Sequence, residues 1–339
     1  MRYNNLGDTG LLVSELCFGT MTFGGEGRWA AIGKQTQKEA DELIKISMAA
    51  GINFIDTANA YSFGQSETIL GNSINNLSLN RNELVIATKV RGSMGEGVNN
   101  QGLSRYHMFN SVEKSLERLK LNYIDILYVH GVDKIVSIKE IMRSLNDLVN
   151  SGKVRYIGVC NWPAWMVMKA NGIARQEGWQ EFKAMQYYYS LANRDVEDEL
   201  VPLSQSEGLG FMPWSPLAGG FLTGKYSRET DKAGGRRDEF DFPPINKERA
   251  YDIVDVMREI SKNNDVSIAE VALAWVRTQN GITSTIIGAK NKKQLDSNIS
   301  STNIELTKSD LDNLAAVSTT EARYPTWMVG FQNQNRIPD

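Results

Sequence analysis

Short apolar runs alternate with longer amphipathic segments from near residue 16 to near residue 300. The apolar runs predict eight strands, at residues 16–18, 53–56, 84–89, 124–130, 154–160, 184–186, 209–214 and 285–288. Between them, apolar residues recur at helical spacing in segments 38–50, 109–119 and 138–149. Because strands that alternate with helices form parallel sheets covered by those helices, the pattern indicates an α/β protein.

The same alternation favours a closed barrel over an open sheet. The strand–helix unit repeats eight times, and no break in composition indicates a second domain. An open dinucleotide-binding sheet is expected to carry a GxGxxG motif after its first strand, whereas the glycines of segment 92–97 follow the third strand in the wrong order. We therefore predict an α/β fold of the (β/α)8 TIM-barrel class, formed as a single domain by residues 1–339.

Segments outside the repeat predict additions to the barrel. Residues 3–6 and 10–13 flank a turn and predict an N-terminal β-hairpin that caps the barrel bottom. Thr307 opens a capping box, which predicts one of the extra C-terminal helices. The long irregular segment 226–246 follows the seventh strand, at the end of the barrel where active sites lie. The aromatic residues of the tail 320–339 suggest that it folds back, and the active site is the surface we consider for it.

Composition and charge exclude several classes of partner. The net charge of −3 provides no basic excess to neutralise phosphates, so we expect no nucleic-acid partner. The two cysteines, Cys17 and Cys160, have neither CxxC nor metal-ligand spacing, so we expect no disulfide framework and no metal site. The N-terminus lacks a signal-like apolar run, and no stretch of about 18 apolar residues occurs. We expect a cytoplasmic protein without a membrane partner.

Four polar residues lie at or just beyond the ends of neighbouring predicted strands. Asp56 ends the second strand, Tyr61 follows five residues later, Lys89 ends the third and His130 ends the fourth. Each has a structural explanation when taken alone: a helix cap, a surface aromatic, a buried cation paired with the carboxylate, and a structural histidine. Because the carboxyl ends of barrel strands meet at one mouth, however, their conjunction favours catalysis.

The chemistry of carbonyl reduction uses each of these groups. A carbonyl that receives a hydride must also receive a proton, and the phenol of Tyr61, with an ordinary pKa of about 10, is a suitable acid if its anion is stabilised. A nearby ammonium stabilises that anion, and a carboxylate holds the ammonium in place. An imidazole N–H orients the carbonyl oxygen and stabilises its developing charge. Proton donation of this kind contributes roughly 10²–10⁴-fold.

At this point the chain resembles the aldo-keto reductase family. Three motifs carry the resemblance, namely Asn53-Phe54-Ile55-Asp56-Thr57-Ala58 with Tyr61, Ala87-Thr88-Lys89-Val90, and Tyr128-Val129-His130-Gly131. The motifs occur in the order typical of the family, and the resemblance extends over nearly the whole chain. It implies that Tyr61 is the general acid, that Lys89 and Asp56 tune it, and that His130 binds the substrate, a small-molecule carbonyl.

The resemblance also implies a nicotinamide cofactor. By resemblance to the family, Cys160, Asn161 and Gln186 of this chain would hold the carboxamide, and Trp214 would stack on the nicotinamide ring. The predicted cofactor residues are Gly19, Thr20, Met21, Asp56, Cys160, Asn161, Gln186, Trp214, Ser215, Pro216, Leu217, Gly219, Lys225, Arg236 and Asn298, together with Gly288, Lys290, Lys292 and Gln294 after the eighth strand.

A phosphate site is indicated after the eighth strand. Asn291 is a suitable N-cap with Gln294 three residues later, and the N-terminus of such a helix attracts anions. Lys290, Lys292 and Lys293 cluster there, so we predict NADPH over NADH. The alternative is that these are solvated surface lysines.

The sequence departs from the family pattern in three places. Cys160 replaces a usual serine, Ser297 replaces an acidic residue, and Ser62-Phe63-Gly64 follows Tyr61 in place of a usual glycine neighbour. We expect the substrate pocket to include four aromatic residues, Trp29, Phe63, Trp162 and Trp327. The identity of the carbonyl and the oligomeric state stay open.

Two other functions are compatible with the motifs. One is a cofactor-binding regulatory subunit, because the potassium-channel β-subunits that resemble this family retain the same four residues. The other is a lyase that forms a Schiff base through Lys89, since barrels can host such lysines.

Overall fold

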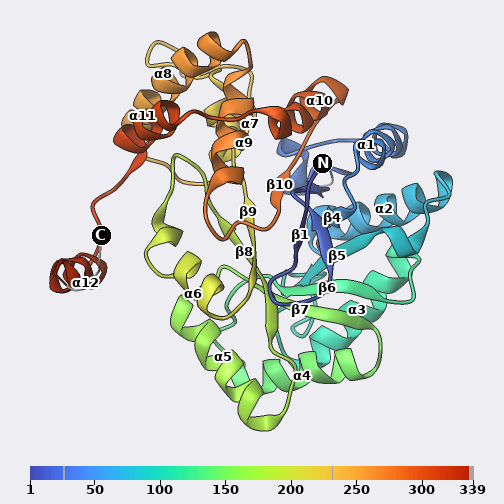
Figure 1. The fold of residues 1–339 in the computed structure, drawn as a ribbon. Helices are drawn as coiled ribbons and strands as arrows, with labels where there is room; N and C mark the ends of the chain where they lie inside the picture. The colour runs from blue at the N-terminus through green and yellow to red at the C-terminus, as the bar shows by residue number, and fades with distance from the viewer. Residues whose placement is uncertain (26, 231, 336–339) are drawn as a thin grey trace.

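The computed structural model describes residues 1–25, 27–230 and 232–335, and within them eight parallel strands form one sheet (Figure 1). The strands are β3 (Leu16–Gly19), β4 (Phe54–Asp56), β5 (Val85–Val90), β6 (Ile124–Val129), β7 (Val154–Cys160), β8 (Phe182–Tyr188), β9 (Gly210–Trp214) and β10 (Thr285–Ile287). Their spatial order is β10-β3-β4-β5-β6-β7-β8-β9. All eight predicted strands are confirmed, with ends that agree to within two residues.

The sheet closes on itself between β9 and β10. Phe211 of β9 pairs with Ile282, just before β10, and the amide of Thr283 donates to the Phe211 carbonyl at 2.9 Å. This closure confirms the predicted (β/α)8 barrel. Buried side chains from alternate strand positions fill its interior, among them Phe54, Ala87, Ile126, Tyr128, Ala184 and Met212.

Small residues and the N-terminal hairpin complete this interior. A β-carbon at Gly158 would lie 2.5 Å from the Tyr128 ring, so glycine there makes room for a large side chain on the adjacent strand. The hairpin of β1 (Tyr3–Asn5) and β2 (Leu12–Ser14) contributes Leu6 and Val13 to the same cluster and confirms the predicted cap.

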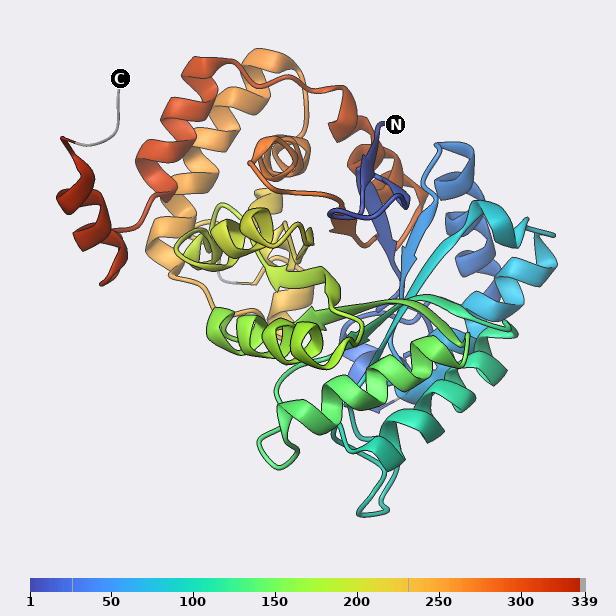
Figure 2. The same cartoon turned by 60° about the horizontal axis from the view of Figure 1, so that its bottom comes forward.

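Helices cover the outside of the barrel, one after each strand (Figure 2). They are α1 (Gln37–Ala49), α2 (Gln65–Asn76), α3 (Arg105–Leu119), α4 (Ile138–Asn150), α5 (Ala164–Glu177), α6 (Leu200–Ser206), α9 (Ile268–Thr278) and α10 (Lys292–Ser300). Their starts follow local chemistry: Thr36, Ser104, Ser137 and Ser267 each accept a hydrogen bond from the backbone three residues on. Two large clusters of apolar side chains fill the layer between strands and helices.

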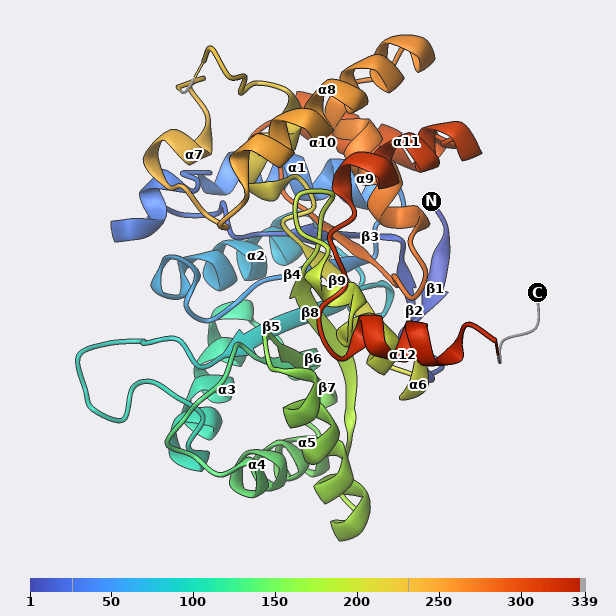
Figure 3. The same cartoon turned by 90° about the vertical axis from the view of Figure 1, so that its left-hand side faces the viewer.

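Four further α-helices of the described residues lie outside this repeat. The short α7 (Arg236–Glu239) lies in the long segment after β9, and α8 (Lys247–Asn264) packs against α9 and α11 (Lys308–Ser318). The tail forms a helix, α12 (Thr326–Asn333), where we expected loop, and none of its side chains is buried. Figures 1 and 2 show α12 standing apart from the barrel, and in Figure 3, where the left-hand side of Figure 1 faces the viewer, α12 lies in front of α6. The structure therefore does not fold α12 over the strand ends.

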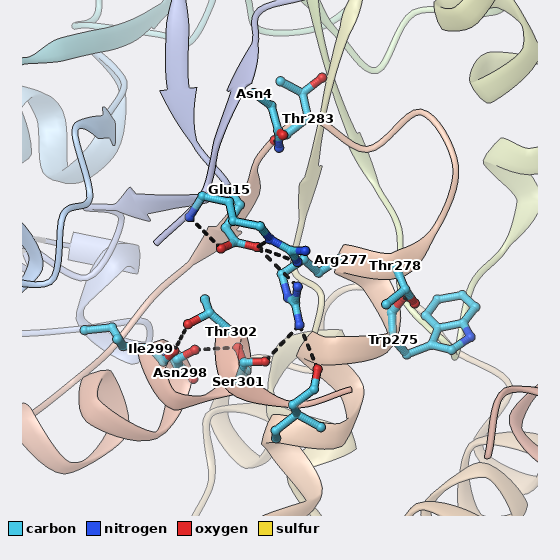
Figure 4. A network of polar contacts seen from close by, with 12 residues as sticks. Asn4, Glu15, Trp275, Arg277, Thr278, Thr283, Asn298, Ile299, Ser301 and Thr302 are labelled. Carbon is cyan, nitrogen blue, oxygen red and sulfur yellow. Dashed lines mark hydrogen bonds and ion pairs between the residues drawn. The ribbon is translucent and has the colours of Figure 1, made fainter. Parts of the chain in front are cut away.

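A buried ionic network fixes the bottom of the barrel (Figure 4). Glu15, only 4% exposed, accepts from the backbone and guanidinium of Arg2 and from Arg277 at 3.2 Å. Arg277 also donates to the carbonyls of Ser301 and Ile304, and the Ser301 hydroxyl donates to the Asn298 carbonyl. The network therefore joins the N-terminal hairpin, α9 and α10 at the end of the barrel opposite the carboxyl ends of the strands.

Candidate active site

The barrel brings the four predicted catalytic residues together at its mouth. Asp56 is the last residue of β4, Lys89 lies near the end of β5, and His130 follows β6. Tyr61 begins a 3₁₀ helix, η2 (Tyr61–Gly64), in the loop after β4. The Lys89 ammonium donates to Asp56 Oδ2 at 2.5 Å, to the Tyr61 hydroxyl at 3.2 Å and to the Thr57 carbonyl at 2.7 Å.

The charge of Lys89 is balanced inside the protein. Its side chain is fully buried, and burial alone would lower its pKa, but the Asp56 carboxylate, together with Tyr61 and Cys160, outweighs burial and raises the pKa of Lys89. The ammonium therefore stays protonated. A Schiff-base lysine needs the opposite shift, toward a neutral amine, so this environment argues against the lyase alternative.

The phenol and the imidazole are in different electrostatic situations. Burial raises the pKa of Tyr61, and the neighbouring Lys89 ammonium opposes that rise. Burial and the same ammonium lower the pKa of His130 to about 3, so its imidazole is neutral at physiological pH. The two rings meet edge to face, with centroids 5.9 Å apart. A neutral imidazole beside a protonated phenol can hydrogen-bond a carbonyl oxygen while the phenol supplies the proton.

The loop that carries Tyr61 has an unusual backbone. Ser62 and Phe63 have φ of 47° and 53°, in the left-handed region that costs a residue with a side chain roughly 1–2 kcal/mol. The buried Ser62 hydroxyl accepts from the Gly25 amide at 3.0 Å and donates to the Phe23 carbonyl at 3.2 Å. These bonds hold the loop against the one after β3, which also places Trp29 edge-on to Tyr61 at 5.4 Å. The sequence alone identified Ser62 only as part of a departure from the family pattern, and did not predict these hydrogen bonds.

Residues predicted to hold a carboxamide lie at or near the carboxyl ends of β7 and β8. Cys160 ends β7 as a buried thiol, and burial raises its pKa. Asn161 accepts from the Trp214 indole at 3.1 Å. Gln186 on β8, 4% exposed, donates to Asp56 Oδ1 at 2.9 Å, a contact that sequence reasoning missed. The predicted carboxamide and proton-delivery groups are therefore in direct contact.

An aromatic stack and a glycine-rich turn follow β9. The Trp214 ring stacks with Tyr188 at 5.0 Å and with Phe242 at 5.9 Å. The Ser215 hydroxyl accepts from the Gly219 amide, whose residue has a φ of 67°, and Pro216 and Leu217 lie within this turn. On the β3 side, Gly19 and Thr20 precede Met21, and the Thr20 amide donates to the Asp56 carbonyl at 2.9 Å.

Positive charge gathers beside this turn. Burial and Arg236 lower the pKa of Lys290, Glu239 opposes them, and Lys225 and Lys34 lower it further, which places these cations near one another. Among residues 1–25, 27–230 and 232–335, no carboxylate forms an ion pair with Lys225, Arg236 or Lys290, and Arg236 Nε is buried without a hydrogen-bond partner. An orphaned buried donor within a cation cluster fits a phosphate-bearing cofactor.

The helix after β10 forms as predicted. Asn291 caps α10 by accepting from the Gln294 amide at 3.0 Å, and the Gln294 side chain accepts from the Lys290 amide. Asn298 donates to the Gly288 carbonyl at 3.0 Å. Lys292 differs from its neighbours, because it pairs with Asp296 along the helix at 2.5 Å. Ser297, the second departure from the family pattern, shares a hydrogen bond with Ser267 of α9.

Two of the four predicted substrate residues lie away from the mouth. Trp162 is 1% exposed and packs edge-on against Phe182 in the layer between strands and helices, which corrects its predicted place in the pocket. Trp327 lies on α12, where its ring contacts Tyr324, so the structure does not bring it to the mouth. Trp29 and Phe63 stay beside Tyr61, and the Phe63 side chain is 49% exposed.

A missed arginine anchors the loop beside Trp214. Arg237, 7% exposed, donates to the carbonyls of Ala218 and Pro243, both at 2.9 Å, and pairs with Asp241. It therefore joins the turn after β9 to the segment that carries Phe242. The sequence offered one signal for it, two adjacent arginines in a long polar loop, but only Arg236 was selected.

Comparison with known proteins identifies relatives over almost the whole chain. A family model described as "Aldo/keto reductase family" matches residues 15–319. Norsolorinic acid reductase B of Dothistroma septosporum is 35% identical, over 96% of this chain and 83% of the relative. Versiconal hemiacetal acetate reductase of Aspergillus parasiticus is 33% identical, over 96% of this chain and 99% of the relative. A rice protein named "Probable voltage-gated potassium channel subunit beta" is 33% identical, over 94% and 96%. In the described residues, no helix is long and apolar enough to cross a membrane.

Proposed function

Since this chain belongs to the aldo/keto reductase family, we propose that it is an NADPH-dependent reductase that converts an aldehyde or ketone to the alcohol, with Tyr61 as the general acid. Family membership and the reductase relatives support carbonyl reduction. The observation that supports this role for Tyr61 is the position of the Lys89 ammonium, which contacts both the Asp56 carboxylate and the Tyr61 hydroxyl.

In the proposed mechanism the residues of this chain bind and orient the carbonyl and move one proton. When bound, the reduced nicotinamide supplies the hydride. His130 donates a hydrogen bond to the substrate oxygen from its neutral imidazole, and Tyr61 gives that oxygen its proton. Lys89 stabilises the phenolate that is left, and Asp56 keeps the ammonium directed at it. The mouth beside Trp29 and Phe63 is the surface that we assign to the rest of the substrate.

The proposed preference for NADPH rests on the cations beside the turn after β9. Arg236 and Lys290 carry positive charge that no carboxylate of the described residues pairs. A 2′-phosphate carries the charge that such a cluster binds. We expect a lower Michaelis constant for NADPH than for NADH, and equal constants or a lower one for NADH would overturn this preference.

An NADPH-consumption screen over aldehydes, ketones and sugar derivatives tests the proposed reaction. For each active substrate, deuterium carried on the reduced nicotinamide should appear on the alcohol carbon of the product, one atom per NADPH consumed. Consumption without labelled alcohol, or no consumption with any carbonyl, would contradict the proposal.

A second candidate function is that of a cofactor-binding regulatory subunit. The observation that favours it is the 33% identity to the rice protein named as a channel β-subunit. For this function we expect tight NADPH binding with at most a few turnovers of any carbonyl. Sustained turnover, at rates of about 1 s⁻¹ or more, would assign the chain to catalysis.

A further inference from the structure

Gln186 makes a hydrogen bond that crosses the barrel. It lies on β8, level with Cys160 on β7 and Met212 on β9. Its partner Asp56 ends β4, four strands away in the order of the eight-stranded sheet, so the two residues come from opposite walls. The Gln186 amide nonetheless donates to Asp56 Oδ1 at 2.9 Å, and both side chains are at most 4% exposed.

This bond divides the two oxygens of the Asp56 carboxylate between different partners. Oδ1 accepts from Gln186, whereas Oδ2 accepts from the Lys89 ammonium at 2.5 Å. Without the amide, Oδ1 would be a buried acceptor with no donor of its own, and both oxygens could turn toward the ammonium. The Lys89–Tyr61 contact, at 3.2 Å the longest of the three that Lys89 makes, is the one that such a turn would weaken.

We infer that Gln186 is a positioning residue of the proton-delivery chain. It holds Asp56 so that Lys89 stays directed at Tyr61, in addition to any contact with a cofactor carboxamide. The inference rests on the proposed function, because it assigns Gln186 a part in proton delivery by Tyr61. It also means that Gln186, which we expect to bind the cofactor carboxamide, is hydrogen-bonded to Asp56, which holds Lys89 beside the general acid Tyr61.

The substitution Gln186→Glu tests this inference through pH. It replaces the amide by a carboxyl of the same shape, which can donate to Asp56 only while it is protonated. The titratable groups around this position are Asp56, Lys89, Tyr61, Tyr128, Cys17 and Cys160. Burial and the adjacent Asp56 charge should raise the pKa of the introduced carboxyl, and the Lys89 ammonium should moderate that rise.

We expect Gln186→Glu to retain near wild-type kcat at acidic pH. Above the pKa of the introduced carboxyl, kcat should fall by about tenfold per pH unit, because the donor is lost and two carboxylates then face each other. The wild type should show no such limb in that range. A variant profile parallel to that of the wild type would overturn the inference.

Unfolding of the cofactor-free protein gives a second readout. A group whose folded pKa is raised stabilises the fold below its unfolded pKa, and this stability is lost as pH rises through the folded pKa. Gln186→Glu should therefore lose Tm relative to wild type as pH rises. The loss should shrink in the double variant Asp56→Asn/Gln186→Glu, where an amide again faces a carboxylate. An unchanged loss would show that the two side chains do not interact.

Asn161 provides the matched control, since it shares the predicted carboxamide role and makes no hydrogen bond to Asp56 among the described residues. Asn161→Ala should raise KM for NADPH and leave the pH profile of kcat unchanged. Gln186→Leu should raise KM and also lower kcat with an altered profile. If both variants change KM alone, the inference is wrong. If the wild type reduces no carbonyl, the proposed function fails, while the unfolding experiment still decides whether Gln186 supports Asp56.

Discussion

Two regions at the barrel mouth contain cations, and they differ in whether a carboxylate neutralises the positive charge. At the catalytic residues, the ammonium of Lys89 is paired with Asp56 and hydrogen-bonded to Thr57 and Tyr61. Beside the turn after β9, burial and Arg237 lower the pKa of Arg236, burial and Arg236 lower the pKa of Lys290, and the described residues offer neither cation an ion-pair partner. In the first region protein groups alone neutralise and hydrogen-bond the cation. In the second region positive charge remains unpaired and is available to an anionic ligand.

The difference follows from what each region has to do. A buried ion pair offsets its desolvation only when the geometry is good and the remaining lone pairs and protons are bonded, as they are around Asp56. A cation that binds phosphate must keep its donors free until the ligand arrives, and this is tolerable because Lys290 and Lys225 remain exposed to water. Balanced charge therefore distinguishes the proposed catalytic residues from the predicted cofactor-phosphate site, where positive charge is unbalanced.

The largest expected effect comes from removing the cation of the balanced region. Lys89→Met leaves Asp56 buried with only the Gln186 amide as a side-chain donor, so we expect a loss of about 3–5 kcal/mol in the free energy of unfolding. Chemical denaturation measures this loss. The double variant Lys89→Met/Asp56→Asn should recover most of the stability but none of the carbonyl reduction. If Lys89→Met were as stable as the wild type, the ion pair with Asp56 would not stabilise this region, and the contrast between the two regions would be wrong.

The unbalanced region should respond through binding instead of stability. Arg236→Ala removes the donor that we propose for the cofactor phosphate, so NADPH affinity should fall by roughly 1.5–3 kcal/mol, with little change for NADH. Fluorescence titration with both dinucleotides measures this difference. Arg228→Ala is the matched control, because Arg228 lies in the same loop and already pairs with Asp252 and Asp255. Equal effects of the two substitutions would contradict the assignment.

Backbone strain next to Tyr61 provides a smaller test of how the balanced region is held. Ser62→Ala keeps a side chain at a φ of 47° and removes both hydrogen bonds, so we expect a loss of about 1–3 kcal/mol. Ser62→Gly relieves the strain as it removes the bonds, and should be about 1–2 kcal/mol more stable than the alanine variant. The two Tm values test this expectation. A higher Tm for Ser62→Ala than for Ser62→Gly would exclude backbone strain at residue 62.

The smallest expected effect is in the pH profile. The pKa of His130 is lowered to about 3, so its stabilising contribution is present above its unfolded pKa of about 6.5 and is lost as pH falls toward 3. The kcat profile should therefore show no His130 limb between pH 5 and 8. His130→Asn should lose less stability than the wild type on acidification. A wild-type inflection near 6.5 that vanishes in this variant would show that the imidazole titrates normally.

Local signals in the sequence were sufficient for most of the fold. Apolar runs, capping residues such as Thr307, and motifs at strand ends depend on neighbours within a few positions, and the structure confirms the elements they predict. Asp56, Lys89 and His130 could be placed together because parallel strands end at one mouth.

The errors came from contacts that no short pattern encodes. The Gln186–Asp56 bond joins residues 130 positions apart across the barrel, so neither periodicity nor a motif predicts it. Trp162 was assigned to the pocket because it follows a strand end, but the chain turns its ring outward into the helix layer. Tail aromatics such as Trp327 suggested a cover for the mouth, whereas α12 stands apart.

The most direct test of the central claim is kcat of Tyr61→Phe, measured with NADPH and a carbonyl that the wild type reduces. The substitution removes only the hydroxyl that Lys89 contacts and leaves the Lys89–Asp56 pair intact. We predict a fall in kcat of roughly 10²–10⁴-fold with an unchanged Kd for NADPH. A variant that keeps the wild-type kcat would show that the phenol is not the proton donor and would contradict the account.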